Sequence, residues 1–273
     1  MNNVIVRSLS GIVYVALLVG AVLYGDVALV VLLSLFSVIG VYEFINMSRD
    51  GKFPRMSTLT DMACGVALII SIWMLTSGHP EGAKHWGVAF LCLLIARLIG
   101  QLYSHNSNST NALGHSITSI IYISLPLALV AVLYNTLAGA HLVLAILIFI
   151  WVNDTGAFCV GSLIGKHKLF ERISPKKTWE GFFGGMIFCV GAALLMNLCF
   201  TDYFAGLTTL QMCILGVVVS IFATFGDLIE SQIKRTAGVK DSSHLMPGHG
   251  GILDRIDSLL LVVPVTVVYF AII

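Results

Sequence analysis

The residues best suited to chemistry gather in a short polar stretch between the last two apolar runs of the chain. One face of a helix would carry the side chains spaced i, i+3, i+4 and i+7, which are Asp227, Glu230, Ser231 and Lys234. Two carboxylates and a hydroxyl suit a hard divalent cation such as Mg2+, because such ions prefer oxygen ligands. Lys234 and the adjoining Arg235 stand where they could hold phosphate oxygens.

A second pair of carboxylates follows at the start of the last apolar run. Asp254 and Asp257 are spaced i, i+3 and share a helical face with Ser258, and the glycine-rich run 247–251 before them permits close approach of the backbone to an anion. His249, within this run, suits either a turn or proton transfer. If the two helix ends pack together, three or four carboxylates crowd at one point, and bound cations would relieve their repulsion. This arrangement predicts a phosphoryl-transfer centre with one or two metal ions.

These acidic residues could instead form ordinary ion pairs at helix ends. For Glu230 and Lys234, at ideal i, i+4 spacing, an ion pair explains the two residues as well as a functional site does. For Asp227, Asp254 and Asp257 together the functional interpretation is favoured, because carboxylates within apolar runs are rare.

The surroundings of these charges are strongly apolar. Of the 273 residues, 58% are hydrophobic and 11% are charged, and the mean hydropathy is +0.95. A water-soluble domain of this composition would expose large apolar patches, so we expect an all-α, polytopic integral membrane protein. Stretches of about 20 apolar residues predict nine spans. They cover residues 8–24, 27–46, 61–77, 85–104, 115–134, 140–160, 181–200, 208–230 and 253–273.

The basic residues give these spans an orientation. With nine crossings, every Lys and Arg except Lys84 and Arg97 falls in loops on one side, and Arg97 is expected to snorkel toward that side. The positive-inside rule then places the N-terminus in the cytoplasm and the C-terminus on the far side. The long polar connections 161–180 and 231–252 would both be cytoplasmic, so we expect an active site that faces the cytoplasm from a bacterial-type inner or plasma membrane.

The first of these connections ends in a basic segment. Ser174 followed by Pro175 predicts a helix N-cap with proline in the first turn, beside Lys176, Lys177 and Thr178. Free backbone N–H groups at such a helix start suit a phosphate. The alternative is that the two lysines only set the topology, near anionic lipid headgroups.

The rest of the chain offers fewer candidates. Asp154, late in the sixth predicted span, is expected to line the same cavity as the acidic cluster. Glu43 and Asp61 are expected to be interfacial or packing partners, so Glu43→Gln should be mild. We expect a single membrane domain, with residues 1–140 as scaffold and 141–273 as catalytic helices and loops.

The polar segments resemble a known family. The pattern Ser231-Gln-Ile-Lys-Arg235, then Lys240-Asp241, then Pro247-Gly-His-Gly-Gly251-Ile-Leu-Asp254-Arg-Ile-Asp257 closely resembles the signature of the phosphatidate cytidylyltransferases, also called CDP-diacylglycerol synthases. Asn153-Asp154, Gly161 and the run 174–181 are similar to a second block typical of that family. The resemblance implies transfer of a cytidylyl group from CTP to phosphatidic acid, which gives CDP-diacylglycerol and pyrophosphate for phospholipid biosynthesis.

The resemblance also implies roles for individual residues. Asp227 and Asp254 would be the leading metal ligands, with Asp257 ligating directly or through an intervening group, and the metal would be Mg2+ with or without an accompanying K+. The implied catalytic residues are Asp227, Lys234, Arg235, Asp254 and Asp257. The implied substrate-binding residues are Ser174, Lys176, Lys177, Thr178, Glu180, Ser231, Lys240, Asp241, His249 and Arg255.

Two other functions fit the same residues. A CTP-dependent lipid kinase of the polyprenol or phytol type would need similar ligands but a hydroxyl acceptor, and a cation-coupled transporter could use the acidic cluster as its ion site. Transporters commonly carry paired half-repeats, which this sequence lacks. The expected partners are CTP, phosphatidic acid and the bilayer, and no nucleic acid. The glycines at 181, 184 and 185 suit either a homodimer or packing within the chain.

Overall fold

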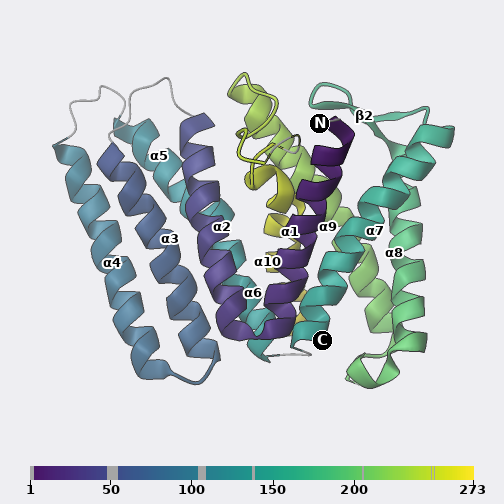
Figure 1. The fold of residues 1–273 in the computed structure, drawn as a ribbon, viewed down its shortest axis with the longest axis horizontal. Coiled ribbons are helices and arrows are strands. Elements are labelled where there is room, and N and C mark those ends of the chain that lie inside the picture. The colour runs from purple at the N-terminus through teal and green to yellow at the C-terminus, as the bar shows by residue number, and fades with distance from the viewer. Residues whose placement is uncertain are drawn as a thin grey trace. The chain divides into compact units, whose positions relative to one another are not determined.

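The computed structural model describes residues 3–47, 55–103, 109–136, 139–204, 206–246, 248 and 250–273. Figure 1 shows that helices dominate it. Among the described residues, eight helices are long and apolar enough to cross a membrane, and a shorter apolar helix covers Ser8–Tyr24. The prediction of an all-α polytopic membrane protein is therefore confirmed.

The helices follow the predicted spans closely, because apolar length alone marks a membrane-crossing segment. The shorter apolar helix belongs to α1 (Asn3–Tyr24). Seven of the eight long spans lie in α2 (Asp26–Met47), α3 (Arg55–Thr76), α4 (Pro80–Leu102), α7 (Ala140–Ile164), α8 (Trp179–Cys199), α9 (Thr209–Thr236) and α10 (Leu253–Ile272), and the eighth is Thr110–Asn135. The fifth predicted span is divided into α5 (Ser109–Ser119), a π turn at Ile120–Ser124, and α6 (Leu125–Thr136). A short 3-10 turn at Thr201–Phe204 follows α8.

Contacts between residues group the chain into two compact units. The first contains Met1–Thr136 and Ala237–Arg255, and the second contains Leu137–Thr236 and Ile256–Ile273. The single domain expected from the sequence stays a prediction.

The first unit contains a buried ion pair. Arg97 on α4 is 5% exposed, and its Nε donates to Asp61 Oδ1 on α3 at 3.2 Å and to the Ser116 hydroxyl at 3.0 Å. Its Nη1 donates to Gln101 at 2.9 Å. The prediction that Arg97 snorkels is wrong, because Asp61 supplies a counter-charge inside the unit. Asp61 is a packing partner, as expected.

Glycines allow α7 and α8 of the second unit to approach closely. A Cβ on Gly181 would lie 2.8 Å from the carbonyl oxygen of Ala157, and one on Gly185 would lie 2.9 Å from that of Asn153. Gly184 similarly faces the side chain of Val160. The glycine face therefore serves packing within the chain, and the homodimer stays a prediction.

The segment between α7 and α8 is a β-hairpin, which the sequence did not predict. Strand β1 (Lys168–Phe170) pairs antiparallel with β2 (Ser174–Thr178), so that Lys168 lies opposite Thr178. The prediction that Ser174 caps α8 is wrong, because the run from Ser174 to Thr178 pairs with β1 as a strand and α8 begins only at Trp179. Thr178 is the N-cap, and its hydroxyl oxygen accepts from the N–H of Gly181 at 3.2 Å.

Candidate active site

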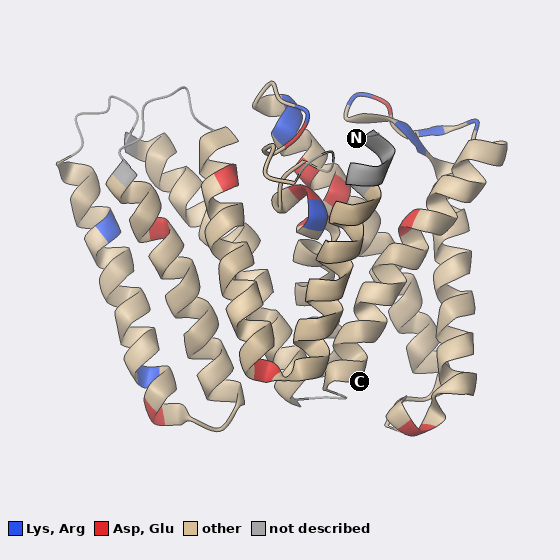
Figure 2. Ribbon diagram, in the orientation of Figure 1, with Lys and Arg blue, Asp and Glu red and all other residues tan. Residues whose placement is uncertain are grey.

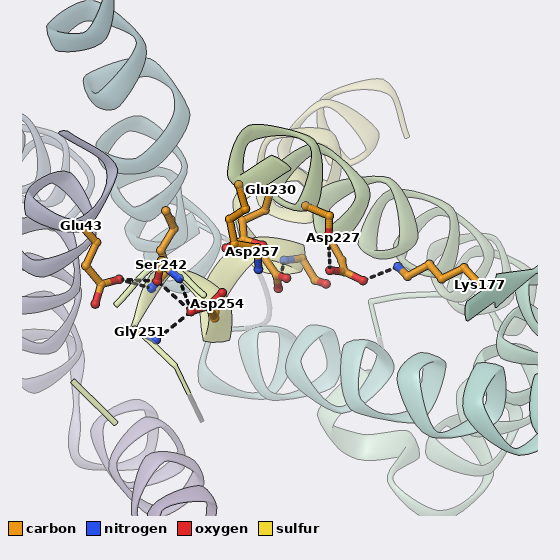
Figure 3. Close-up of polar contacts among 12 residues, drawn as sticks. Glu43, Lys177, Asp227, Glu230, Ser242, Gly251, Asp254 and Asp257 are labelled. Carbon is orange, nitrogen blue, oxygen red and sulfur yellow. Dashed lines mark hydrogen bonds and ion pairs between the residues drawn. The ribbon is translucent and has the colours of Figure 1, made fainter. Parts of the chain in front are cut away.

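An acidic cluster lies in the second unit, formed by Asp227 and Glu230 of α9 and Asp257 of α10. One carboxylate oxygen from each residue lies within 4.8 Å of the others. Figure 3 shows the three side chains converging from the two helices. The structure thus brings Asp227 and Asp257, which the family resemblance implied as metal ligands, together with Glu230, which helical spacing offered as a cation ligand and the resemblance left out of the metal set.

The helices approach closely because α9 has a glycine next to Asp227. A Cβ on Gly226 would lie 2.8 Å from the carbonyl oxygen of Asp257 and 2.9 Å from the Cα of Ser258. The Ser258 hydroxyl donates to the carbonyl oxygen of Ala223 at 3.1 Å. The acidic cluster therefore depends on backbone contact between α9 and α10.

Two lysines neutralise part of the cluster. Lys177 of β2 forms an ion pair with Asp227, drawn in Figure 3, and its ammonium also donates to the carbonyl oxygen of Thr224 at 3.4 Å. Lys234 forms an ion pair with Glu230, whose side chain is fully buried. The ion pair considered for Glu230 and Lys234 exists, and Glu230 belongs to the acidic cluster as well.

The donor set of the cluster fits a hard divalent cation. All three side chains offer carboxylate oxygens, the ligands that Mg2+ prefers, and they are close enough for a common ion. Three carboxylates at this spacing repel one another, and two lysines supply only part of the positive charge that would balance them. Asp227, Glu230 and Asp257 are therefore the residues that would hold a metal ion.

Asp254 has its own set of donors in the first unit. Its Oδ2 accepts from the N–H of Ser242 at 2.9 Å, the hydroxyl of Ser242 at 2.8 Å and the N–H of Gly251 at 2.7 Å. These bonds tie the first turn of α10 to the segment before it. The role of Asp254 as a metal ligand stays a prediction.

Comparison with known proteins adds to this geometry. A sequence model of the cytidylyltransferase family matches residues 5–273. The chain belongs to the cytidylyltransferase family. Relatives in this family include the phosphatidate cytidylyltransferase of Staphylococcus haemolyticus, which is 33% identical over 265 residues and is matched over 96% of its length by 95% of this chain. Those of Staphylococcus saprophyticus and Staphylococcus aureus (strain COL) are each 35% identical, with the same coverage.

Most of the remaining residues implied by the family resemblance are near the charged end of the second unit. Figure 2 shows its Lys and Arg on the β1–β2 hairpin and on the last turn of α9. The hydroxyl of Ser231 donates to Asp227 Oδ1 at 3.4 Å. Glu180 accepts from the N–H groups of Lys166 and His167, at 3.1 and 3.2 Å, so it holds the base of the hairpin. Arg235 and Lys176 are exposed.

Other members of that set lie in the first unit. Lys240, Asp241 and Arg255 are exposed, and the carbonyl oxygen of Arg255 accepts from the hydroxyl of Tyr14 at 3.0 Å. His249 lies outside the described residues. The structure leaves the substrate-binding roles of these cytidylyltransferase residues as predictions.

Sequence reasoning missed Asn153 as a positioning residue. Its side-chain oxygen accepts from the hydroxyl of Ser220 at 2.7 Å, and its amide donates to Thr224 at 3.4 Å, so it joins α7 to the turn of α9 that precedes Asp227. Its neighbour Asp154 is exposed on α7, and its expected place in the cavity stays a prediction. The signal that could have identified Asn153 as a positioning residue was the presence of an asparagine deep in an apolar run.

Proposed function

We propose that the acidic cluster of α9 and α10 is the metal-dependent centre at which this protein transfers a cytidylyl group from CTP to phosphatidic acid. The single observation that carries the proposal is the convergence of Asp227, Glu230 and Asp257 beside two lysines. It occurs in a chain that matches phosphatidate cytidylyltransferases over 95% of its length. The products are CDP-diacylglycerol and pyrophosphate.

The reaction needs charge neutralisation and alignment more than proton transfer. A phosphate oxygen of phosphatidic acid attacks the α-phosphorus of CTP, a new P–O bond forms, and the bond to the β-phosphate breaks as pyrophosphate leaves. Because the nucleophile is already an anion, no strong general base is required. Positioning in line with the leaving group then supplies most of the acceleration.

The residues of the cluster divide this work. Asp227, Glu230 and Asp257 would hold Mg2+, with or without an accompanying K+. When bound, Mg2+ supplies neutralisation of the phosphate charge. The ammonium groups of Lys177 and Lys234 orient the two carboxylates that they contact, and they lie close enough to the cluster to bind phosphate oxygens.

The distribution of basic residues and the different solubilities of the two substrates support a site at the cytoplasmic surface of a bacterial plasma membrane. The Lys and Arg of the second unit gather at the hairpin end of its helices (Figure 2), the end that the positive-inside rule assigns to the cytoplasm. CTP arrives from that side. A lipid with two acyl chains leaves the bilayer only at a cost of about 0.8 kcal/mol per methylene, so the lipid must reach the site from the membrane.

Labelled nucleotide separates this function from its rivals. Purified protein in detergent, given phosphatidic acid and Mg2+, should move label into lipid from CTP labelled at the α-phosphate and not from CTP labelled at the γ-phosphate. Transfer of the γ-label would indicate a lipid kinase. Absence of any labelled lipid would remove the proposal, and product formation without a membrane gradient would exclude transport as the sole activity.

A further inference from the structure

Glu43 is a buried carboxylate of α2 that the reaction described above does not use. It is 2% exposed, and four groups donate to it. Its Oε1 accepts from the Ser243 hydroxyl at 2.6 Å and from the N–H of Ile252 at 3.1 Å. Its Oε2 accepts from the Ser242 hydroxyl at 3.0 Å and from the N–H of Leu253 at 2.8 Å. Each oxygen therefore takes one hydroxyl and one backbone donor.

These bonds form a helix cap supplied from a distant part of the chain. Helix α10 begins at Leu253, and Ile252 before it has no side-chain acceptor for the unpaired N–H groups of the first turn. Glu43, which is 209 residues from Ile252 in sequence, provides that acceptor. A carboxylate is also favoured at a helix N-terminus by the helix dipole.

The segment before α10 is shaped around this carboxylate. A Cβ on Gly251 would overlap both oxygens of Glu43 and the hydroxyl of Ser242, so the chain passes here without room for a side chain. The Ser242 hydroxyl lies within hydrogen-bond distance of both Glu43 and Asp254, as Figure 3 shows. Glu43 is thus linked to Asp254, and α10 carries Asp257 one turn further on.

We propose that Glu43 is a positioning residue for cytidylyl transfer. It holds the first turn of α10 in place, and with it the carboxylates that this helix carries. The proposal rests on the proposed function for its effect on turnover. It replaces the expectation that Glu43→Gln is mild, because the four donors could not be predicted from the sequence.

Glu43→Gln tests the proposal with little change in size. In either orientation of the amide, its NH2 group faces the N–H of Ile252 or of Leu253, and one backbone donor loses its acceptor. We expect faster hydrogen exchange in peptides that contain residues 251–253, measured by mass spectrometry. We also expect a fall in kcat on the order of 10²-fold, with a smaller change in KM for CTP, since a small misplacement of catalytic groups costs about this much.

A matched control lies at the other end of the same helix. Asp26 accepts from the indole N–H of Trp73 at 3.0 Å, and Asp26→Asn keeps an oxygen acceptor while it removes a charge from α2. Asp26→Asn should leave both the exchange at 251–253 and kcat at wild-type values. The proposal is overturned if Glu43→Gln also keeps wild-type exchange at 251–253 and wild-type kcat, or if both variants change these two quantities equally.

A second variant covers the case in which Glu43→Gln does not insert. Ser243→Ala removes one donor to Glu43 and leaves the sequence of α2 unchanged. It should raise exchange at 251–253 and lower kcat by a smaller factor than Glu43→Gln does. Wild-type exchange and wild-type kcat in Ser243→Ala would overturn the proposal. Failure of the proposed function is distinguishable, because wild-type protein would then make no CDP-diacylglycerol while the exchange comparison still reports on the cap.

Discussion

Gly226 of α9 lies directly against the backbone of Asp257 of α10, so that a methyl group on Gly226 would be 2.8 Å from the carbonyl oxygen of Asp257. This contact is between two backbones, and neither can move aside as a flexible side chain would. Because Asp227 is the next residue of α9, the same contact sets the separation of two carboxylates in the acidic cluster.

Gly226→Ala should therefore separate the two helices at the cluster. We expect a loss of activity on the order of 10²-fold, because the carboxylates shift relative to one another. We expect a loss of stability of about 1–3 kcal/mol from overpacking. Formation of labelled CDP-diacylglycerol and thermal unfolding in detergent measure the two effects. Gly191→Ala in α8 is the control, since a Cβ there meets nothing within 4 Å, and it should be close to wild type.

Asp227→Asn should abolish formation of CDP-diacylglycerol while the protein still inserts and purifies. The substitution removes a carboxylate oxygen from the cluster and takes the counter-ion from Lys177. Asp257→Asn should have the same effect, and binding of Mn2+ followed by electron paramagnetic resonance should weaken in both variants. Asp202→Asn, in the exposed turn after α8, should change neither measurement. Turnover near wild type in Asp227→Asn would contradict the assignment of the metal ligands.

The two lysines of β2 should differ, although they are neighbours in sequence. Lys177 is half-buried and forms the ion pair with Asp227, whereas Lys176 is exposed. Lys177→Met should lower kcat/KM by about 10- to 100-fold, the range expected for the loss of a charged hydrogen bond. Lys176→Met should have a smaller effect. Equal effects in the labelled-CTP assay would show that only the charge of the hairpin matters.

The sequence predicts the fold better than the site. The spans could be predicted because a membrane-crossing helix is marked by its own apolar length, and the convergence of Asp227 and Asp257 follows from their places at the ends of adjacent spans. Partners that are distant in sequence could not be predicted. Arg97 donates to Asp61, which lies 36 positions away in sequence, and Glu43 accepts from donors about 200 positions away. Helical periodicity carries no information about such pairs.

Local rules also failed where two conformations compete. The segment from Ser174 to Thr178 satisfies the pattern of a capped helix start, yet it is a strand, and the cap lies at Thr178. The hairpin places Lys177 beside Asp227. The spacing of Glu230 and Lys234 fits an ion pair or a functional site, and the structure shows Glu230 both in the ion pair and in the acidic cluster.

This dual role of Glu230 predicts that stability and activity can be separated. Glu230→Gln leaves Lys234 buried without its carboxylate, and breaking a buried pair by removing one partner typically costs about 3–5 kcal/mol. The double variant Glu230→Gln with Lys234→Met removes the other partner of this pair as well, so its thermal unfolding should return toward that of wild type. Its production of CDP-diacylglycerol should stay low, because the cluster still lacks one carboxylate and one ammonium group. If the double variant recovers activity together with stability, Glu230 serves only the ion pair and does not belong to the catalytic centre.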